Sequence, residues 1–392
     1  MPSPLGEVCS AFLKLGLTSF GGPVAHLGYL REEFVGKRRW LTDDAYADLV
    51  ALCQFLPGPA SSQLVFALGM LRAGILGALA ASLCFMLPSV LLMLALAYGV
   101  TRVASLQGAG WLHGLKLAAV AVVAQAVWSM GRSICIDRAR LILCILAAII
   151  TLVAPGTLTQ IGVIAACALL GWILYHRTPV PPPSEPPAKV RGHIPALIAL
   201  IVFFALLVLL PLAAATGNKS LALFDSFYRS GALVFGGGHV VLPLLRAEVV
   251  PPGWITDDAF LAGYAGAQAV PGPLFTFAAY LGTVIQGGPN AWVGGLWCLL
   301  AIFLPAWLLI GGTLPFWHQL RAKSWAQAAL KGANAAVVGL LLAALYTPVI
   351  TESITSPLDV AAALIAFAAL QFLKAPPWAV VALLAAAGQW AI

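Results

Sequence analysis

The sequence predicts an all-helical integral membrane protein with about 12–13 transmembrane helices in two related halves. Three observations lead to this prediction: the composition, an internal repeat, and Gly or Pro breaks at matched places in the two halves. The composition is strongly apolar: 61% of the 392 residues are hydrophobic and only 9% are charged. Soluble domains carry about 25% charged residues. A chain with so much apolar surface requires a lipid bilayer as its solvent.

The apolar runs are long and continuous, as in Ile194 to Ala215, which favours helices. A membrane β-barrel would instead show short segments that alternate apolar and polar residues. The start of the chain, Met1 to Ser10, has no basic segment or cleavage site, so we expect no cleaved signal peptide. The seven cysteines stand singly in apolar surroundings without a CxxC spacing. We therefore expect them to pack in the core, and we expect no metal and no cofactor.

The two halves of the chain repeat each other. The segment Phe12 to Gly22 matches Phe227 to Gly237, at an offset of 215 residues, and Trp40 to Ala45 matches Trp254 to Ala259 at 214. Matched segments in the same order at a nearly constant offset indicate a duplication. The expected parts are a first transmembrane repeat at 1–175, a Pro-rich linker at 176–193, an extra connecting helix at 194–215 and a second repeat at 216–392.

Apolar segments of spanning length give the expected helix count. Those before the linker are 8–30, 44–70, 74–100, 110–132, 139–154 and 159–175. Those of the second half are 224–246, 258–284, 290–314, 325–348, 357–373 and 376–391. An unpaired helix between equal halves would invert the second half, as in transporters whose site lies where broken helices meet. If every segment crosses, the basic loop 31–43 lies opposite the basic loops near 132–140, 176–193 and 315–324, so charge favours a cytoplasmic N-terminus only modestly.

Glycine pairs interrupt matched apolar segments at Phe20 to Pro23 and at Phe235 to Gly238. A helix that restarts after such a break points free N–H groups and a positive dipole end into a protein-lined cavity, which suits an anion. A packing kink or a close helix crossing is the alternative. The candidate binding residues here are Gly21, Gly22, Pro23, Gly236, Gly237 and Gly238.

A Pro-Gly-Pro motif breaks the next segment of each half and has amide and hydroxyl side chains around it. Such side chains can donate hydrogen bonds to an oxyanion without adding a fixed charge. Interhelical hydrogen bonding is the alternative. The candidate residues are Gln54, Pro57, Gly58, Pro59, Ser61 and Ser62 in the first half and Gln268, Pro271, Gly272, Pro273 and Thr276 in the second.

Four basic residues stand at matched places inside apolar segments. Lys14 is equivalent to Arg229, and Lys116 is equivalent to Lys331. Since a basic residue near a helix centre costs about 2.5–3.5 kcal/mol, matched placement suggests a use such as binding an anion. Snorkelling to the membrane surface is the alternative. Two histidines, His26 and His239, follow the glycine breaks without being equivalents, and each is a candidate proton carrier or a packing residue.

These motifs together resemble the chromate ion transporter family in its long, two-domain form. The residues that carry the resemblance are Phe20 to His26, Pro57 to Pro59, Phe235 to Pro243 and Gln268 to Pro273. The resemblance covers almost the whole chain. It implies a secondary transporter that exports chromate across the bacterial inner membrane and confers chromate resistance.

Other functions stay open beside this one. Sulfate is a tetrahedral dianion like chromate, so a transporter or channel for sulfate or another small anion is the alternative. A membrane enzyme such as a chromate reductase is a third, but the sequence lacks P-loop, G-x-S-x-G, HExxH and haem or flavin signatures, and we expect no enzyme. The expected partners are a small oxyanion and the bilayer, with protons and a homodimer left open and no nucleic acid.

Overall fold

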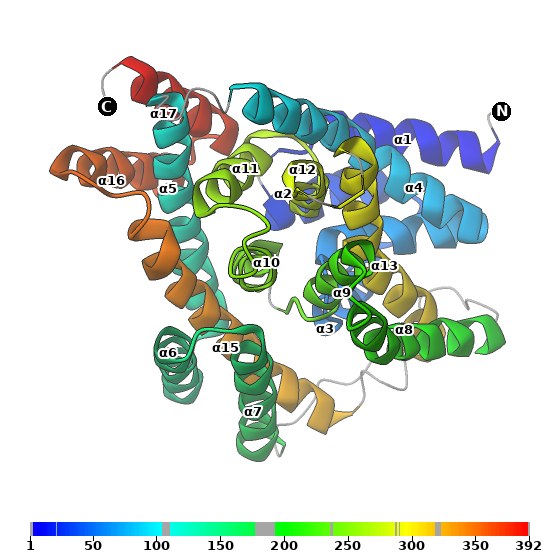
Figure 1. Cartoon of the computed structure of the whole chain (residues 1–392). Helices are drawn as coiled ribbons and strands as arrows, with labels where there is room; N and C mark the ends of the chain where they lie inside the picture. Colours follow the sequence, from blue (N-terminus) through cyan, green and yellow to red (C-terminus); the bar gives the residue numbers. More distant parts are fainter. Residues whose placement is uncertain are drawn as a thin grey trace.

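The computed structural model describes residues 3–20, 22–103, 110–176, 193–235, 238–286, 288–289, 291–317 and 323–390. Every regular element in these ranges is a helix (Figure 1), which confirms the predicted fold class. The predicted linker at 176–193 lies almost wholly outside the described residues.

The helices of the first half follow the sequence breaks. They are α1 (Pro4–Thr18), α2 (Gly22–Arg31), the π-helical turn η1 (Glu32–Lys37), α3 (Asp43–Phe55), α4 (Ala60–Val103), α5 (Gly110–Ile134), α6 (Arg138–Val153) and α7 (Thr157–Tyr175). The α4 helix consists of two parts, 60–72 and 75–103, because Ala73 and Gly74 have non-helical backbone angles. Thr42 caps α3 by accepting a hydrogen bond from the N–H of Ala45.

The second half repeats this order after α8 (His193–Ala214). Its helices are α9 (Lys219–Ala232), η2 (Gly238–Val240), α10 (Val241–Val249), α11 (Asp257–Ala269), η3 (Leu274–Thr276), α12 (Phe277–Val284), α13 (Ala291–Thr313), η4 (Leu314–Phe316), α15 (Ser324–Ala344), η5 (Leu345–Ile350), α16 (Pro357–Gln371) and α17 (Pro377–Trp390). The α8 helix, which has no equivalent, exposes most of its apolar surface and lies at the edge of the molecule (Figure 1). That surface suits contact with lipid.

The first segment of each half folds back on itself at the glycine break. Phe12 of α1 packs against Phe34 of η1, with ring centroids 4.8 Å apart. At the start of α1, Glu7 accepts a hydrogen bond from the indole N–H of Trp40 at 3.1 Å. Residues nearer the start of α1 thus contact residues farther along the chain, so α1 runs antiparallel to α2 and η1. Together they form a helical hairpin, with the start of α1 beside the end of η1. In the second half, Arg229 of α9 reaches back to Glu248 of α10 at 2.9 Å in the same way.

The second segment of each half is also a hairpin, and it turns at the Pro-Gly-Pro motif. In the second half, the Tyr280 hydroxyl of α12 donates to the Ala259 carbonyl of α11 at 2.9 Å. In the first half, Arg72 at the end of the 60–72 helix pairs with Glu7 at 2.6 Å. The chain has therefore returned to the base of the first hairpin by residue 72.

These hairpins change the expected number of crossings. The segments 8–30, 44–70, 224–246 and 258–284 were each expected to cross the membrane once, whereas each consists of shorter helices that fold back at its break. In the described part of the chain, six helices are long and apolar enough to cross a membrane: Ala60–Val100, Gly110–Ile134, Thr157–Tyr175, His193–Ala214, Ala291–Phe316 and Ser324–Ile350. Shorter apolar helices, among them Pro357–Gln371 and Pro377–Gln389, complete the bundle.

The path of the chain now places its loops. Arg38 and Arg72 both bond to Glu7, so residues 31–42 and 72–74 lie together on one side, which we call the first side. If the long apolar helices 75–103 and α5 each cross the membrane, the chain is back on that side at residue 135. Tyr175 joins this side because its hydroxyl donates to Asp137 at 2.6 Å. The α8 helix is long and apolar enough to cross to the second side, and this crossing would start the second half there, inverted relative to the first.

The basic residues follow this division. Those in or beside the first-side loops are Arg31, Lys37, Arg38, Arg39, Arg72, Arg132, Arg138 and Arg140. Those at described helix ends on the second side are Arg102, Lys219 and Arg246. The expectation that loop 31–43 lies opposite loop 132–140 assumed that every segment crosses, and the fold-back of α1 and α2 favours the same side for both loops instead. With these loops on one side, the positive-inside rule clearly favours the first side as cytoplasmic.

The two halves exchange one helix each, α5 and α15. The α5 helix of the first half packs against α16 and α17 of the second, and α15 of the second half packs against α6 and α7 of the first (Figure 1). We call these groups the exchanged bundles. Small residues allow the close crossings: a Cβ on Gly114 of α5 or on Gly332 of α15 would collide with the backbone of α17 or α7.

Candidate functional site

The four hairpin tips of the two halves meet in the molecule. They lie at Ser19–Gly22, Pro57–Pro59, Leu233–Gly238 and Pro271–Pro273, and we call them tips 1 to 4. Three predicted residues at these tips, Gly21, Gly236 and Gly237, lie outside the described residues, as does the side chain of Pro23.

Two backbone hydrogen bonds join the tips across the halves. The N–H of Gly58 in tip 2 donates to the Val234 carbonyl in tip 3 at 2.6 Å. The N–H of Gly272 in tip 4 donates to the Ser19 carbonyl in tip 1 at 2.9 Å. The donors are equivalent residues, and so are the acceptors. Such reciprocal contacts are the mark of a two-fold relation between the halves, whose axis passes between the tips.

Both glycine donors need the freedom that glycine gives. Gly58 has φ 124° and Gly272 has φ 102°, in a region that residues with a Cβ rarely adopt. The two flanking prolines of each motif have no N–H, so the glycine supplies the only backbone donor of its Pro-Gly-Pro turn. This explains physically why the same tripeptide stands at tips 2 and 4.

A helix begins directly after each tip. The α2 helix starts at Gly22 and α4 at Ala60, while η2 and η3 lead into α10 and α12. The first N–H groups of a helix have no partner within it, and the helix dipole makes this end positive. Four such ends therefore gather where the halves meet, an arrangement that favours a bound anion.

Buried polar side chains stand at the tips, and several of their atoms have no protein partner. The Ser89 hydroxyl lies 2.6 Å from that of Thr276, and the Gln63 amide donates to the Pro57 carbonyl at 2.7 Å. At the tips, the buried atoms without a protein partner are Nδ1 of His26, Oγ of Ser62 and Oε1 of Gln63, and further such atoms lie elsewhere in the described residues. Since buried polar atoms are almost always satisfied, the three at the tips have room to bond water or a ligand.

The two histidines lie at the tips of different halves. His26 Nε2 is 3.1 Å from the Ser19 carbonyl within the first hairpin, and its ring meets the edge of Phe85. His239 Nδ1 is 3.0 Å from the Tyr264 hydroxyl. Both therefore have packing and hydrogen-bonding roles in the structure, and a role in carrying protons stays a prediction.

The remaining amides and hydroxyls of the prediction occupy different surroundings. Ser61 is buried next to Ser62, whereas Gln54 is exposed near the end of α3. Its equivalent Gln268 is half-buried, and its amide is 3.5 Å from His239 Nδ1. Their contact with a substrate stays a prediction.

Lys14 and Arg229 occupy equivalent places in the first hairpin of each half. Lys14 Nζ is 3.4 Å from Glu33, and Arg229 lies 2.9 Å from Glu248 and from Asp225. Each cation is thus bound to a carboxylate, which reduces the charge it offers to a substrate. Sequence reasoning missed this pairing, although Glu33 and Glu248 are themselves 215 residues apart and could have been found by that offset.

Lys116 and Lys331 lie on the exchanged bundles. Lys116 Nζ of α5 pairs with Asp258 at 3.0 Å and donates to the Glu352 carbonyl at 3.1 Å. Lys331 of α15 lies over the Tyr175 ring, 5.2 Å from its centroid. Binding of a substrate by these lysines stays a prediction.

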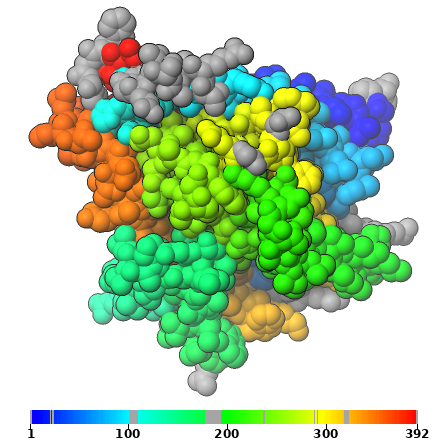
Figure 2. All heavy atoms as spheres, viewed as in Figure 1, coloured from blue at the N-terminus to red at the C-terminus, as the bar shows by residue number. Residues whose placement is uncertain are grey.

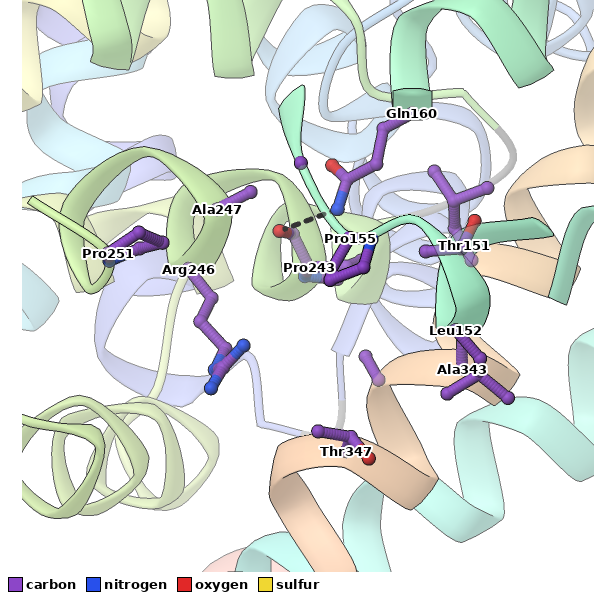
Figure 3. Close-up of a pocket in the computed structure, with 13 residues that line it drawn as sticks. Thr151, Leu152, Pro155, Gln160, Pro243, Arg246, Ala247, Pro251, Ala343 and Thr347 are labelled. Carbon is purple, nitrogen blue, oxygen red and sulfur yellow. Dashed lines mark hydrogen bonds between the residues drawn. The ribbon is translucent and has the colours of Figure 1, made fainter. Parts of the chain in front are cut away.

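A cavity of about 430 Å³ opens on the second side, between α10, α15 and the loop that joins α6 to α7 (Figure 3). Arg246 lines one wall and pairs through two hydrogen bonds with Asp257. On the other wall, Gln160 reaches from α7 to the Pro243 carbonyl at 3.4 Å. In the space-filling view, α10 and α11 reach the surface between the α6–α7 pair and α12 (Figure 2).

Inverted halves with broken helices that meet between them define the class of polytopic membrane transporters built from inverted repeats. Comparisons with known proteins agree. The chromate transporter family matches residues 6–172 and 221–389. The chain therefore belongs to the chromate transporter family.

Relatives are similar over most of their length. A chromate transport protein of Pseudomonas aeruginosa is 34% identical over 87% of this chain and 80% of its own. A chromate transport protein of Cupriavidus metallidurans is 28% identical over 94% of this chain and 88% of its own. A probable chromate transport protein of Synechococcus elongatus is 28% identical over 87% and 83%. No solved structure matches the chain.

Proposed function

We propose that this protein exports chromate across the bacterial plasma membrane and so confers resistance to chromate. The names of its relatives support the substrate. The observation that carries the binding site is the reciprocal meeting of four helix starts where the inverted halves join. The same site would accept sulfate, which has the same shape and charge, so a sulfate or other anion transporter is the second candidate.

The dianion would be bound chiefly by neutral donors at the tips. The proposed donors are the backbone N–H groups after Gly22 and Gly238 and the unpartnered hydroxyl of Ser62. The Thr276 hydroxyl donates to the Pro273 carbonyl and would have to turn to join them. Lys14, whose contact with Glu33 is long, would offset part of the charge, whereas the charge of Arg229 is already balanced by Asp225 and Glu248. Partial compensation favours release, because a transporter must let its substrate leave.

The direction of transport is proposed from the charge of the substrate. The basic first side is taken as cytoplasmic, and the interior of a bacterial cell is electrically negative. Moving one charge through a potential of 100 mV is worth about 2.3 kcal/mol, so a dianion leaving alone gains roughly twice that. Export then needs no nucleotide hydrolysis. Proton entry through His26 or His239 would add to this drive.

Uptake of labelled chromate by inverted membrane vesicles tests the proposal. We expect saturable uptake that unlabelled sulfate inhibits if both anions share the site. Uptake that does not saturate would indicate a channel. Reduction of chromate by the purified protein would indicate an enzyme. If the vesicles take up sulfate but no chromate, sulfate is the substrate and the proposal for chromate is wrong.

The unpartnered hydroxyl at tip 2 gives a residue-level test. Ser62→Ala should raise KM for chromate about tenfold or more, because a hydrogen bond to a charged group is lost. Its thermal stability should stay near wild type, since Ser62 Oγ makes no bond to the protein. The control is Ser129→Ala on α5, whose hydroxyl bonds only to its own helix. An unchanged KM for Ser62→Ala would remove this hydroxyl from the site.

A further inference from the structure

The second hairpins of the two halves differ in what they pack against. The α11 helix packs firmly on α5 and α17. Two-fold symmetry would place its equivalent, α3, on α15 and α7. In the described part of the chain, α3 makes no comparable packing with either helix. The α11 helix of the second half is thus packed against an exchanged bundle. The equivalent α3 helix of the first half is not.

One ion pair marks the docked side. Lys116 of α5 pairs with Asp258, the second residue of α11, at 3.0 Å. The same Lys116 donates to the backbone carbonyl of Glu352 at 3.1 Å. This ion pair therefore joins α11 to the exchanged bundle formed by α5, α16 and α17.

The equivalent residues are present on the other side but separated. Asp258 corresponds to Asp44 and Lys116 to Lys331. Asp44 is exposed, and neither residue makes an ion pair within the described ranges. Lys331 lies instead over the ring of Tyr175, whose hydroxyl donates to Asp137. Lys331 therefore contacts its exchanged bundle, as Lys116 does, but has no carboxylate partner from α3 in the described residues.

A second set of equivalent ion pairs, Arg31–Asp43 and Arg246–Asp257, also differs between the two sides, in the exposure of its side chains. The side chains of Arg31 and Asp43 on the first side are 62% and 60% exposed. Those of Arg246 and Asp257 on the second side are 24% and 23% exposed. The two pairs thus agree on one difference: their second-side members are paired or packed more closely than their first-side equivalents.

We propose that Asp44 and Lys331 form an ion pair that closes the first side in the opposite state of the transport cycle, in place of the Lys116–Asp258 pair. Inverted repeats support this, because each half can adopt the packing that the other shows here. The proposal rests on the proposed transport function, with the site at the tips exposed alternately to the two sides. All four residues are positioning residues, since they act on the site through the hairpins that carry its tips.

The second-side cavity provides room for the change. It separates Arg246 and Ala247 of α10 from Thr151, Leu152 and Thr347 on the facing elements (Figure 3). If α11 moves away from α5, α10, which a short loop connects to α11, can move into this space. Its volume of about 430 Å³ corresponds to several side chains.

Charge reversal tests the pair through transport. Asp44→Lys and Lys331→Asp should each lower chromate flux about fivefold, the factor that a partly exposed ion pair is worth. The double variant should restore most of the flux. Controls are Asp43→Asn, which lies beside Asp44 but pairs with Arg31, and Lys323→Gln at the exposed start of α15. Single variants with wild-type flux, or a double variant no better than either, would overturn the pair.

Crosslinking tests the same pair without transport. In a background without the seven native cysteines, Asp44→Cys with Lys331→Cys should react with a short bismaleimide only in molecules closed on the first side. Adding Asp258→Asn, which weakens the present closure, should raise the crosslinked fraction severalfold. No crosslink in either background would refute the exchange of ion pairs even if chromate transport is intact. Crosslinking in a protein that moves no anion would instead refute the transport function and leave the conformational change in place.

Discussion

The basic residue of the first hairpin has unequal surroundings in the two halves. Arg229 is 22% exposed and its partners Asp225 and Glu248 are 5% and 8% exposed. Lys14 is 59% exposed beside Glu33. Burial makes the arginine a structural necessity, because two carboxylates would otherwise be left without a counter-ion.

Removing each cation should therefore have different effects on stability. Arg229→Ala should lower stability by about 3–5 kcal/mol. Lys14→Ala should lower it by about 1 kcal/mol or less, because an exposed ion pair contributes little. Thermal unfolding of the two variants in the same detergent measures the difference. Equal losses of stability would contradict the unequal burial.

Hydrogen bonds control the ionisation of Asp137, which lies on the first side. Burial alone would raise the pKa of Asp137, but hydrogen bonds from the Tyr175 hydroxyl and from Arg140 outweigh it and lower the pKa to about 2. Asp137 therefore stays charged at all physiological pH values. This fixed charge at the start of α6 holds Tyr175 in place under Lys331.

At the scale of elements, the helices cross where a glycine stands. Gly16 of α1 and Gly231 of α9 are equivalent, and a Cβ on either would collide with a carbonyl of the facing helix, Phe85 or Ile302. Each crossing brings a first hairpin against the helix that follows the second hairpin. The tips are held in register by these close contacts.

Gly16→Ala should therefore be destabilising by about 1–3 kcal/mol, the usual effect of overpacking. Gly28→Ala is the matched control, since Gly28 lies in α2 with nothing within 4 Å of an added Cβ. The control should be neutral or slightly stabilising, because alanine favours the helix. Thermal unfolding and the monodispersity of each purified variant report the outcome. A harmless Gly16→Ala would mean that α1 and α4 are farther apart than described.

At the scale of the whole molecule, the folded-back hairpins decide which loops share a side. Gly36 lies at the base of the first hairpin and Ile136 lies between α5 and α6. If α1 and α2 crossed the membrane as one helix, these two residues would lie on opposite sides. In the structure they lie on the same side.

Cysteine labelling distinguishes the two topologies. In a background without native cysteines, Gly36→Cys and Ile136→Cys should react with a membrane-impermeant reagent only from the cytoplasmic side. Gly253→Cys, which lies between α10 and α11, should react only from the outside. Labelling of Gly36→Cys and Ile136→Cys from opposite sides would disprove the hairpins.

The candidate site was predictable in part. Glycine and proline breaks in both halves marked the tips, and the structure brings them together through Gly58 and Gly272. Ser89 and Tyr264 were missed, because a single hydroxyl in an apolar helix gives no sign of its neighbours. Ser89 meets Thr276 of the other half, 187 residues away.

The sequence by itself determined the class of fold, the two halves, the extra helix and the places where helices stop. Composition and local backbone chemistry are enough for these features, since a Pro-Gly-Pro motif breaks a helix in any surroundings. Only the tertiary structure decided where the chain goes after each break. A return rather than a crossing depends on distant contacts such as Phe12 with Phe34 and Glu7 with Arg72. The exchange of helices between the halves and the unequal docking of α3 and α11 depend on such contacts too, because they join residues that are far apart in the sequence.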